Sequence, residues 1–274
     1  MADKQKLADE LSEKAKEIRQ LILRMTYNAN SGHPGGSMSA TEIILALYKY
    51  KIKHNPKNPS DSNRDRFVLS KGHCCPALYS VLADCGYFKK EELMTFRKIN
   101  SRLQGHPASH ELPGIEASTG PLGMGLSFAN GVALAGKLDK KNYRAYVLMG
   151  DGEIQEGMIW EAAMTAGFRK LDNLVGIVDY NHLQIDGFIE NVKNSAPIKE
   201  KFEAFGWNVI EVDGHNFIEL FNALDEAEKV KGKPTLILAH TTKCKGVSFM
   251  ENKCEYHGKA LNDDEMKKAM EELK

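Results

Sequence analysis

The spacing of apolar residues predicts a long amphipathic helix at the start of the chain. Between residues 4 and 27, apolar positions recur every three or four residues with charged residues between them. These positions are Leu7, Leu11, Ala15, Ile18, Ile22 and Met25. The helix should end near Asn28, because the glycine- and proline-rich stretch 31–36 cannot continue it. Further helices are predicted at residues 41–50, 76–84 and 89–98, with a short strand at 67–69.

A strand–turn–helix–strand unit occupies the middle of the chain. The apolar run 145–149 is short enough to be a buried strand, and the tight turn Gly150-Asp151-Gly152 follows it. A helical segment at 157–168 then leads to a second apolar run, 174–178, which ends at Asp179-Tyr180-Asn181. Units of this kind build parallel sheets, because the helix carries the chain back to the starting edge.

The rest of the chain continues the alternation of strands and helices. Strands are predicted at 207–212 and 235–240, and helices at 123–138, 217–229 and 263–273. Residues 102–127 are mostly loop, and a loop of that length in a compact domain is usually functional or disordered. The predicted fold is therefore α/β, with a parallel sheet flanked by helices in a single domain over residues 1–274.

Polar residues follow the two strands of the central unit at their carboxyl ends, where open α/β sheets bind ligands. Asp151 follows the first strand and Asn181 follows the second. If the strands are neighbours, the two oxygen ligands converge, and Gly152 lets a bulky group approach the backbone. Such a set suits Mg²⁺ shared with a phosphate. On these residues alone, a plain β-turn with a helix cap explains the Gly-Asp-Gly turn equally well.

Four of the nine histidines lie on loops beside glycine. They are His33, His73, His106 and His257. One such histidine could merely cap a turn, but four together favour a site, since imidazole donates to phosphates and carries protons near neutral pH. The other five are expected to be structural or exposed: His54, His110, His182, His215 and His240.

Composition excludes several classes of protein. Thirty-seven basic residues balance thirty-seven acidic ones, so nothing favours nucleic acid as a partner. No apolar run approaches the length of a membrane span, and the charged N-terminus lacks the apolar core of a signal peptide. The five cysteines form no CxxC pair, which suits reduced thiols in a cytoplasm.

Seven motifs, in this order, resemble the transketolases. They are SGHPGG, FVLSKGH, GHP followed by ELPG, STGPLGMGLS, GDGEIQEG, the IDG after Asn181, and YHG. The match runs from about residue 5 to 260 and corresponds to the amino-terminal third to half of such enzymes. The resemblance also gives a context to the spacing between the Gly-Asp-Gly turn and Asn181, which is that of the magnesium–diphosphate signature of thiamine diphosphate enzymes.

The resemblance implies a role for each matching residue. Asp151, the Asn181 side chain and the Leu183 carbonyl match magnesium ligands, for which Ca²⁺ or Mn²⁺ are possible substitutes. His73, Gly152 and Asn181 match groups that hold the diphosphate, and Gly120-Pro121-Leu122 matches the loop against the aminopyrimidine. His33, His106 and His257 match the histidines that face the substrate. Glu156 matches a glutamate at the subunit interface.

The sequence departs from the family pattern in three places. Asp179-Tyr180 precedes Asn181 where the broader pattern favours a polar residue directly before the asparagine, and the GHP loop carries an apparent one-residue insertion beside His110. The larger departure is that family members continue with a pyrimidine-binding domain and a further domain. We therefore expect a natural amino-terminal subunit of a two-chain transketolase rather than a fragment. It would transfer a two-carbon ketol unit between sugar phosphates, within a heterotetramer formed with the pyrimidine-domain chain.

Three other functions are consistent with part of the pattern. One is the α-subunit of a two-chain 2-oxo acid dehydrogenase. The SGHPGG and TGPLG loops argue against it, because they resemble those of transketolases. Another is a subunit that binds the cofactor without catalysing a reaction. The presence of all four loop histidines argues against it. A nucleotide-binding protein of the Rossmann type is disfavoured, because no GxGxxG follows the first strand.

Overall fold

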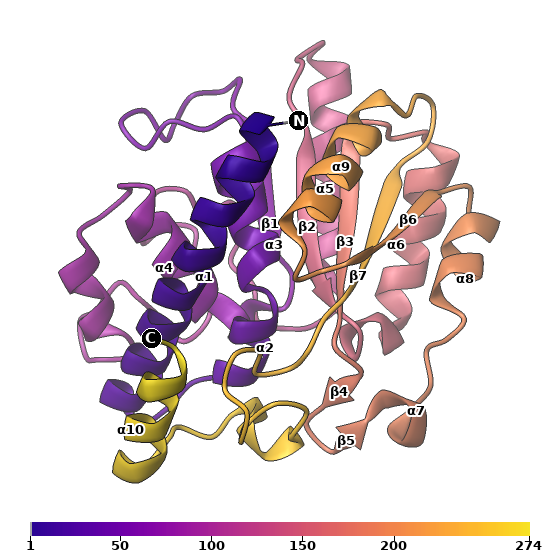
Figure 1. Cartoon of the computed structure of the whole chain (residues 1–274). Coiled ribbons are helices and arrows are strands. Elements are labelled where there is room, and N and C mark those ends of the chain that lie inside the picture. Colours follow the sequence, from indigo (N-terminus) through magenta and orange to yellow (C-terminus); the bar gives the residue numbers. More distant parts are fainter. Residues whose placement is uncertain (1) are drawn as a thin grey trace.

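Five parallel strands form the centre of the computed structural model, which describes residues 2–274 (Figure 1). Their spatial order is β1-β2-β3-β7-β6, and every neighbouring pair is parallel. The strands are β1 Arg66–Leu69, β2 Ala145–Gly150, β3 Leu174–Tyr180, β6 Asn208–Asp213 and β7 Thr235–His240. β2 and β3 pair from Ala145 with Leu174 to Gly150 with Asp179, so they end level with each other, and the residues after them lie at one edge.

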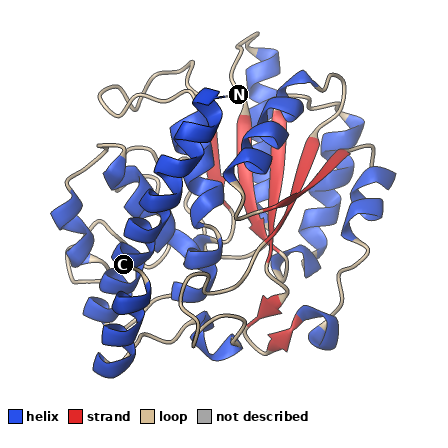
Figure 2. Cartoon of the chain, viewed as in Figure 1, coloured by secondary structure: helices blue, strands red, loops and turns tan. Residues whose placement is uncertain are grey.

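Helices cover both faces of this sheet (Figure 2), as the sequence predicts. Alternate strand residues enter two separate cores. Phe67 and Leu148 pack on one face and Val68 and Val147 on the other, because successive side chains of a strand point to opposite faces. The inner strands β2, β3 and β7 are largely apolar and buried, which is typical of a parallel sheet covered on both faces, whereas the edge strand β6 is partly exposed.

Four helices supply much of the first core, to which Met38 and Ala269 of two further helices also contribute. The four are α1 Ala2–Ala29, α3 Thr41–Ala46, α4 Cys75–Asp84 and α9 Phe217–Lys229. The second core is covered by three. They are α5 Met124–Leu138, α6 Gly157–Phe168 and α8 Ile198–Ala204. The buried stripe of α5 and α6 consists largely of alanine and glycine, which lets both helices lie close to the sheet.

Several short elements differ from the sequence prediction. The glycine-rich stretch after α1 begins a helix of its own, α2 Pro34–Ser39, because Pro34 suits a first helical position. The predicted helix at 89–98 is shorter, a 3₁₀ helix at Lys90–Thr95, and Arg97 after it has a left-handed backbone with φ of 58°. The second predicted helix ends in a π-helical turn at Leu47–Lys51.

The segment between β3 and β6 was not predicted in detail. It contains the two-stranded hairpin β4 Leu183–Gln184 with β5 Gly187–Phe188, then α7 Ile189–Val192 and α8. At the end of the chain a 3₁₀ turn, Cys254–His257, precedes α10 Asp263–Glu272, whose N-terminus is closed by a capping box between Asn262 and Glu265.

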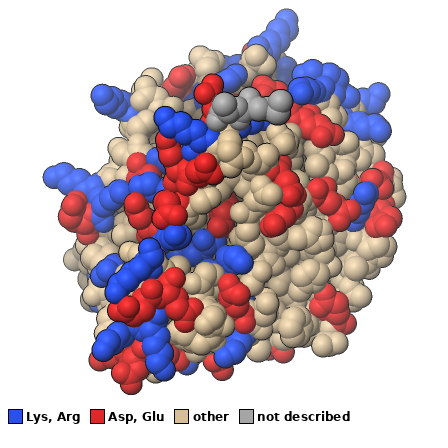
Figure 3. All heavy atoms as spheres, in the orientation of Figure 1, with Lys and Arg blue, Asp and Glu red and all other residues tan. Residues whose placement is uncertain are grey.

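Charged side chains of both signs are interspersed on the face shown in Figure 3. Within residues 2–274, no helix combines the length and apolar character that a membrane crossing requires.

Candidate active site

A cavity of about 350 Å³ opens where the strands of the sheet end. Lys71 follows β1, Asp151 follows β2, Asn181 follows β3 and Lys243 lies beyond β7, and all four side chains line it. The sequence prediction that Asp151 and Asn181 meet at one sheet edge is correct, because β2 and β3 are neighbours. The remaining lining residues include His33, Gly36, His73, His106, Gly120, Leu122, Gly152, Glu153, Glu156, Leu183 and His257.

The four glycine-flanked histidines form one cluster in this cavity. The ring centroid of His33 lies 5.1 Å from that of His73, 5.5 Å from that of His257 and 6.3 Å from that of His106. The rings of His73 and His257 stack with centroids 5.2 Å apart. Four loops that are remote in the sequence therefore present their imidazoles to a single volume.

Burial keeps these imidazoles neutral at physiological pH. The pKa of His33 falls to about 4, through burial first and then the nearby charge of Arg97. Burial and Lys243 lower the pKa of His257 to about 3. The pKa values of His73 and His106 are also lowered, with burial as the main cause. A neutral imidazole can accept a proton from a hydroxyl and donate a hydrogen bond at its other nitrogen.

Asp151, Asn181 and the Leu183 carbonyl lie on two short turns that hydrogen bonds connect. The Asp151 carboxylate accepts from the backbone N–H groups of Gly152, at 2.8 Å, and His182. His182 has a left-handed backbone with φ of 65°, and this turn lets the Leu183 N–H donate to Asn181 Oδ1 over 3.1 Å. His182, which the sequence predicts to be structural or exposed, thus shapes the turn through its backbone.

These oxygen atoms suit a hard cation. Asp151 is buried, and burial first, then the charge of Asp179, raises its pKa to about 6. The charge of Lys243 acts in the opposite direction on this pKa, and a cation beside Asp151 would likewise stabilise the ionised form. The Leu183 carbonyl already accepts from an ammonium, that of Lys243, over 2.8 Å. Carboxylate, amide and carbonyl oxygens are the ligands that Mg²⁺, Ca²⁺ and Mn²⁺ prefer.

The protein alone supplies an incomplete ligand set. Among the residues that the structure describes, no group of three histidine, cysteine or acidic side chains could hold a metal. Mg²⁺ commonly binds through one or two carboxylates and completes its coordination with phosphates and water. The donor set around Asp151 therefore fits a magnesium ion that arrives with a diphosphate and does not fit a metal bound by protein alone.

Sequence reasoning missed two buried lysines in the wall of the cavity. Lys71 and Lys243 are 2% and 1% exposed, which is rare for lysine. Lys71 forms an ion pair with Asp179 and donates to the Gly36 carbonyl over 3.1 Å. Lys243 donates to the carbonyl of Leu183 and to Nδ1 of His257, each over 2.8 Å. The signal in the sequence was weak: Lys71 belongs to the FVLSKGH motif, but nothing marks Lys243 as buried.

Glu153 was also missed. Its buried carboxylate accepts from the Ser70 hydroxyl and from the backbone N–H groups of Gly123 and Gly150, each of the latter two at 2.9 Å. It thereby connects the ends of β1 and β2 with the start of α5, where Gly123 is left-handed with φ of 88°. In the sequence, only the position of Glu153 directly after the Gly-Asp-Gly turn indicates that it belongs to the site.

The glycine loops are partly as predicted. Gly120 and Leu122 line the cavity, while Pro121 between them is exposed and does not. Gly152 lines it too, in an ordinary right-handed conformation, and a Cβ there would lie 3.2 Å from that of Gln184. A 3₁₀ turn at Glu153–Gln155 separates Gly152 from α6, so that helix begins later than a direct strand–turn–helix connection would place it.

The five remaining histidines lie outside the cavity. His54 contacts the Tyr48 carbonyl and the Tyr87 hydroxyl, and His215 pairs with Glu42 and accepts from the Thr242 N–H. His182 and His240 make exposed contacts with Glu190 and Glu211. The side chain of His110 is 77% exposed.

Comparison with known proteins agrees with this geometry. The family described as "Transketolase, thiamine diphosphate binding domain" matches residues 11–274. The chain is 44% identical to the 6-deoxy-6-sulfo-D-fructose transketolase subunit SqwG of Clostridium sp. (strain MSTE9), covering 96% of each chain. It is 42% identical to an apulose-4-phosphate transketolase subunit of Phocaeicola vulgatus, covering 93% of this chain and 90% of that one.

The fold is likewise that of a solved relative. The crystal structure of transketolase from Campylobacter jejuni superposes with a TM-score of 0.90 at 40% identity, over 96% of this chain and 42% of that one. The chain therefore spans about two fifths of the length of that enzyme. With a strand-end cavity, a family match over nearly its whole length and relatives at this level of identity, the chain belongs to the transketolase family as its thiamine diphosphate binding domain.

Proposed function

We propose that this chain is the diphosphate-binding subunit of a two-chain transketolase, which transfers a two-carbon ketol unit from a ketose to an aldose. The observation that carries the proposal is the gathering of four neutral imidazoles above buried oxygen ligands in one cavity. The two relatives named as transketolase subunits, matched over nearly their whole length, support it.

The floor of the cavity would hold the charged end of the cofactor. Asp151, the Asn181 amide and the Leu183 carbonyl would bind Mg²⁺, with Ca²⁺ or Mn²⁺ as possible substitutes. His73, Gly152 and Asn181 would contact the diphosphate, and Lys243 would offset its charge. Gly120, Pro121 and Leu122 would lie beside the aminopyrimidine, although only the first and last line the cavity.

Thiamine diphosphate, when bound, supplies the carbon nucleophile and electron sink that break and form carbon–carbon bonds beside a carbonyl. The chain's own residues would move protons and orient the sugar. His33, His106 and His257 are neutral at pH 7, so each could accept a proton from a sugar hydroxyl or donate to a developing alkoxide.

The substrates would be sugars with an anionic end. One of the two relatives is named for 6-deoxy-6-sulfo-D-fructose and the other for apulose 4-phosphate, so both names specify a sugar bearing a sulfonate or a phosphate. We propose the same class for this chain, with sugar phosphates as the first substrates to test.

A partner chain would cover the outer faces of α5 and α6. This apolar face consists of exposed side chains on both helices: Met124, Phe128, Leu134, Leu138, Met158, Met164 and Phe168. Clusters of exposed large apolar residues mark interaction sites. The face is continuous with the cavity, because Leu122 and Glu156 line the cavity and Gly123 lies against Glu156 and Met158. A chain docked here would therefore reach the mouth of the site.

We propose that this occupant is the carboxy-terminal transketolase subunit, which carries the pyrimidine-binding domain. Two copies of each chain, a heterotetramer, would be the simplest symmetric assembly in which every site is walled by both chains. The names of the relatives, which call them subunits, support a second chain.

Ketol transfer by the purified chain, with and without the partner, tests the proposal. Xylulose 5-phosphate and ribose 5-phosphate serve as substrates, with thiamine diphosphate and Mg²⁺ present. We expect no turnover by the chain alone and turnover when the pyrimidine-domain chain is added. Full turnover by the chain alone would contradict the two-chain proposal. Oxidative decarboxylation of 2-oxo acids by the mixture, without ketol transfer, would instead assign it to the 2-oxo acid dehydrogenase class.

A further inference from the structure

Asp179 is a buried carboxylate whose role the proposed function leaves open. It lies on β3, is 0% exposed, and precedes Asn181 by two positions. Asn181 directly follows the strand, and its side-chain amide lies on the same side of the chain as the Asp179 carboxylate, with Nδ2 3.4 Å from Oδ2. In the sequence, Asp179 stood out only as part of Asp179-Tyr180-Asn181, where Tyr180 takes the place of the polar residue that the broader pattern favours.

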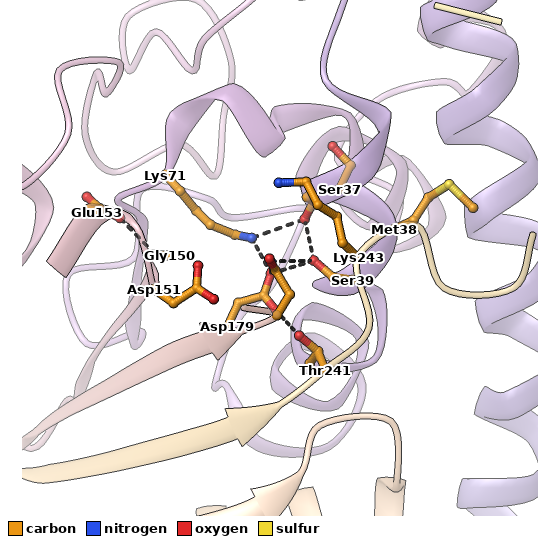
Figure 4. A network of polar contacts seen from close by, with 12 residues as sticks. Ser37, Met38, Ser39, Lys71, Gly150, Asp151, Glu153, Asp179, Thr241 and Lys243 are labelled. Atoms are coloured by element: carbon orange, nitrogen blue, oxygen red, sulfur yellow. Dashed lines mark hydrogen bonds and ion pairs between the residues drawn. The ribbon is translucent and has the colours of Figure 1, made fainter. Parts of the chain in front are cut away.

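Four side chains from four segments converge on this carboxylate, and Figure 4 shows three of them pointing toward it. Ser39 of α2 donates to Oδ2 over 2.6 Å, Lys71 after β1 forms an ion pair with the same oxygen, and Thr241 after β7 donates to Oδ1. The fourth is the Asn181 amide, whose Nδ2 lies 3.4 Å from Oδ2.

The contacts of the Asp179 carboxylate are those of an acceptor. The Lys71 ammonium forms an ion pair with Oδ2, and the Ser39 and Thr241 hydroxyls donate to Oδ2 and Oδ1, so both oxygen atoms accept from neighbouring donors. An ionised carboxylate has no proton to donate, so every neighbouring group must offer it a donor. That requirement applies to the Asn181 amide as well.

The amide of Asn181 therefore has one acceptable orientation. Its NH₂ group must face Asp179 and Ser39, each 3.4 Å away. Its carbonyl oxygen then points to the other side, where it accepts from the Leu183 N–H over 3.1 Å. With the amide reversed, two oxygen atoms would face each other at Asp179 and two N–H donors would meet at Leu183.

We propose that Asp179 is a positioning residue that fixes the Asn181 amide with its oxygen directed to the metal position. The inference rests on the proposed function, because it concerns the same metal and diphosphate site. Asp179 would not touch the metal or the cofactor itself. Partners that orient a metal-binding side chain typically change metal affinity by roughly 10- to 100-fold when they are removed.

A structural role for Asp179 makes a different prediction. If the residue only neutralised Lys71, its loss would lower the stability of the fold but leave metal affinity unchanged in the protein that folds. Asp179→Asn alone would leave the Lys71 ammonium buried and unpaired, which is strongly destabilising. The double variant Asp179→Leu/Lys71→Met removes both charges together, and it also removes the oxygen that accepts from the Asn181 amide, so it is the better test.

The probe is Mn²⁺ binding by the full chain in the presence of thiamine diphosphate, measured by electron paramagnetic resonance. We expect the double variant to bind Mn²⁺ at least about tenfold more weakly than the wild type. Thr241→Val is the matched control, because it removes a donor from Oδ1 and leaves Oδ2 and the Asn181 contact intact. We expect it to bind Mn²⁺ like the wild type, with folding of each variant checked by circular dichroism.

Lys71→Met alone separates the lysine from the aspartate. Because it leaves the Asp179 carboxylate buried without its ion pair, its Mn²⁺ affinity is compared only in protein that circular dichroism shows to be folded. If Lys71→Met weakens Mn²⁺ binding as much as the double variant does, or if the folded double variant binds within about twofold of wild type, the inference is wrong. An absence of Mn²⁺ binding by the wild-type chain would instead overturn the proposed function, and the inference with it.

A measurement on the wild type does not depend on the folding of any variant. The side-chain amide of Asn181, assigned by comparison with Asn181→Asp, should show nuclear Overhauser contacts between its NH₂ protons and Ser39. Contacts of those protons with the Leu183 N–H instead would show the reversed amide and overturn the inference.

Discussion

Lys243 donates a hydrogen bond to Nδ1 of His257 over 2.8 Å, and its ammonium also reaches the Leu183 carbonyl over 2.8 Å. An ammonium has no acceptor, so Nδ1 of His257 must accept, and the proton of the neutral ring must lie on Nε2. One buried lysine thereby connects a proposed metal ligand with a proposed catalytic histidine and sets the tautomer of that histidine.

Replacing Lys243 should weaken cofactor binding. Lys243→Met removes a buried positive charge from the proposed diphosphate site, and a hydrogen bond to a charged group contributes about 1.5–3 kcal/mol. We expect the dissociation constant of thiamine diphosphate with Mg²⁺, measured by calorimetry, to rise about 10- to 100-fold. The control is Lys245→Met, since the Lys245 side chain is 40% exposed on the same loop. Equal affinities for both variants would contradict this role.

Removing the Asp151 charge should abolish metal-dependent cofactor binding. Asp151→Asn keeps the size of the side chain but offers a cation only a neutral oxygen, and one of the two backbone donors loses its acceptor. We expect the fold to persist and the gain in thiamine diphosphate affinity on adding Mg²⁺ to disappear in calorimetry. Asp139→Asn, on the exposed end of α5, should retain the gain. A variant at Asp151 that still responds to Mg²⁺ would refute the assignment.

The loop histidines should separate into two groups. His106→Ala or His257→Ala should lower turnover of the reconstituted enzyme by about a hundredfold or more with little change in cofactor affinity, the usual effect of lost acid–base assistance. His73→Ala should weaken cofactor binding instead. His110→Ala is the control, because its side chain is exposed outside the cavity. Steady-state kinetics and calorimetry on the four variants check this division.

The sequence predicted the site best where parallel strands determine positions. Asp151 and Asn181 each follow an apolar run, and two neighbouring parallel strands necessarily bring the residues after them to one edge. The sheet, its flanking helices and the shared position of these two residues followed from that rule. The hairpin Leu183–Gln184 with Gly187–Phe188 did not, because strands of two residues carry no periodicity to detect.

The sequence pattern does not predict which charged residues are buried. Lysine and glutamate are usually exposed, so Lys71, Lys243 and Glu153 looked like ordinary surface residues. Each is buried because partners arrive from distant segments, as Asp179 does for Lys71 and Ser70 does for Glu153. The histidine loops were recognised as a group by their glycines, but the contacts between their rings depend on how four loops pack.

The histidine cluster should also make the fold sensitive to mild acid. In the unfolded chain these imidazoles bind protons near about pH 6.5. In the fold, burial lowers the pKa of His33 to about 4 and that of His257 to about 3, and Arg97, Lys243 and the neighbouring histidines act in the same direction. Between about pH 6.5 and 4 the unfolded state therefore binds more protons, so the free energy of unfolding should fall as the pH falls.

Urea unfolding at pH 7, 6 and 5 measures this dependence. The carboxylates Asp84 and Asp225, whose pKa values lie at about 2, titrate below that range and do not obscure it. Asp151, whose pKa lies at about 6, takes up a proton in the fold and offsets part of the decline, so the comparison between wild type and a histidine variant isolates the imidazoles. The double variant His33→Gln/His257→Gln should show a flatter decline than the wild type. An equal decline in both proteins would mean that other groups take up the protons.

The apolar face on α5 and α6 should decide whether a partner binds. Phe128→Lys/Met164→Lys places two charges on that face, where docking would bury them without a counter-charge. We expect the variant to fold, because both side chains are about half exposed, and to bind thiamine diphosphate with Mg²⁺ as the isolated wild-type chain does. Mixed with the pyrimidine-domain chain, it should form no complex in size-exclusion chromatography with light scattering and show no ketol transfer.

The matched control is Ile99→Lys, which also replaces an exposed apolar residue with lysine but lies outside the face, after Lys90–Thr95. Ile99 is 94% exposed, so this control should assemble and turn over like the wild type. If the α5–α6 variant assembled normally, the partner would have to bind elsewhere, although the face adjoins the cavity at Leu122 and Glu156. If it assembled but remained inactive, these side chains would affect the site itself. Loss of assembly and activity together, with cofactor binding retained, is the result that a site completed by a second chain requires.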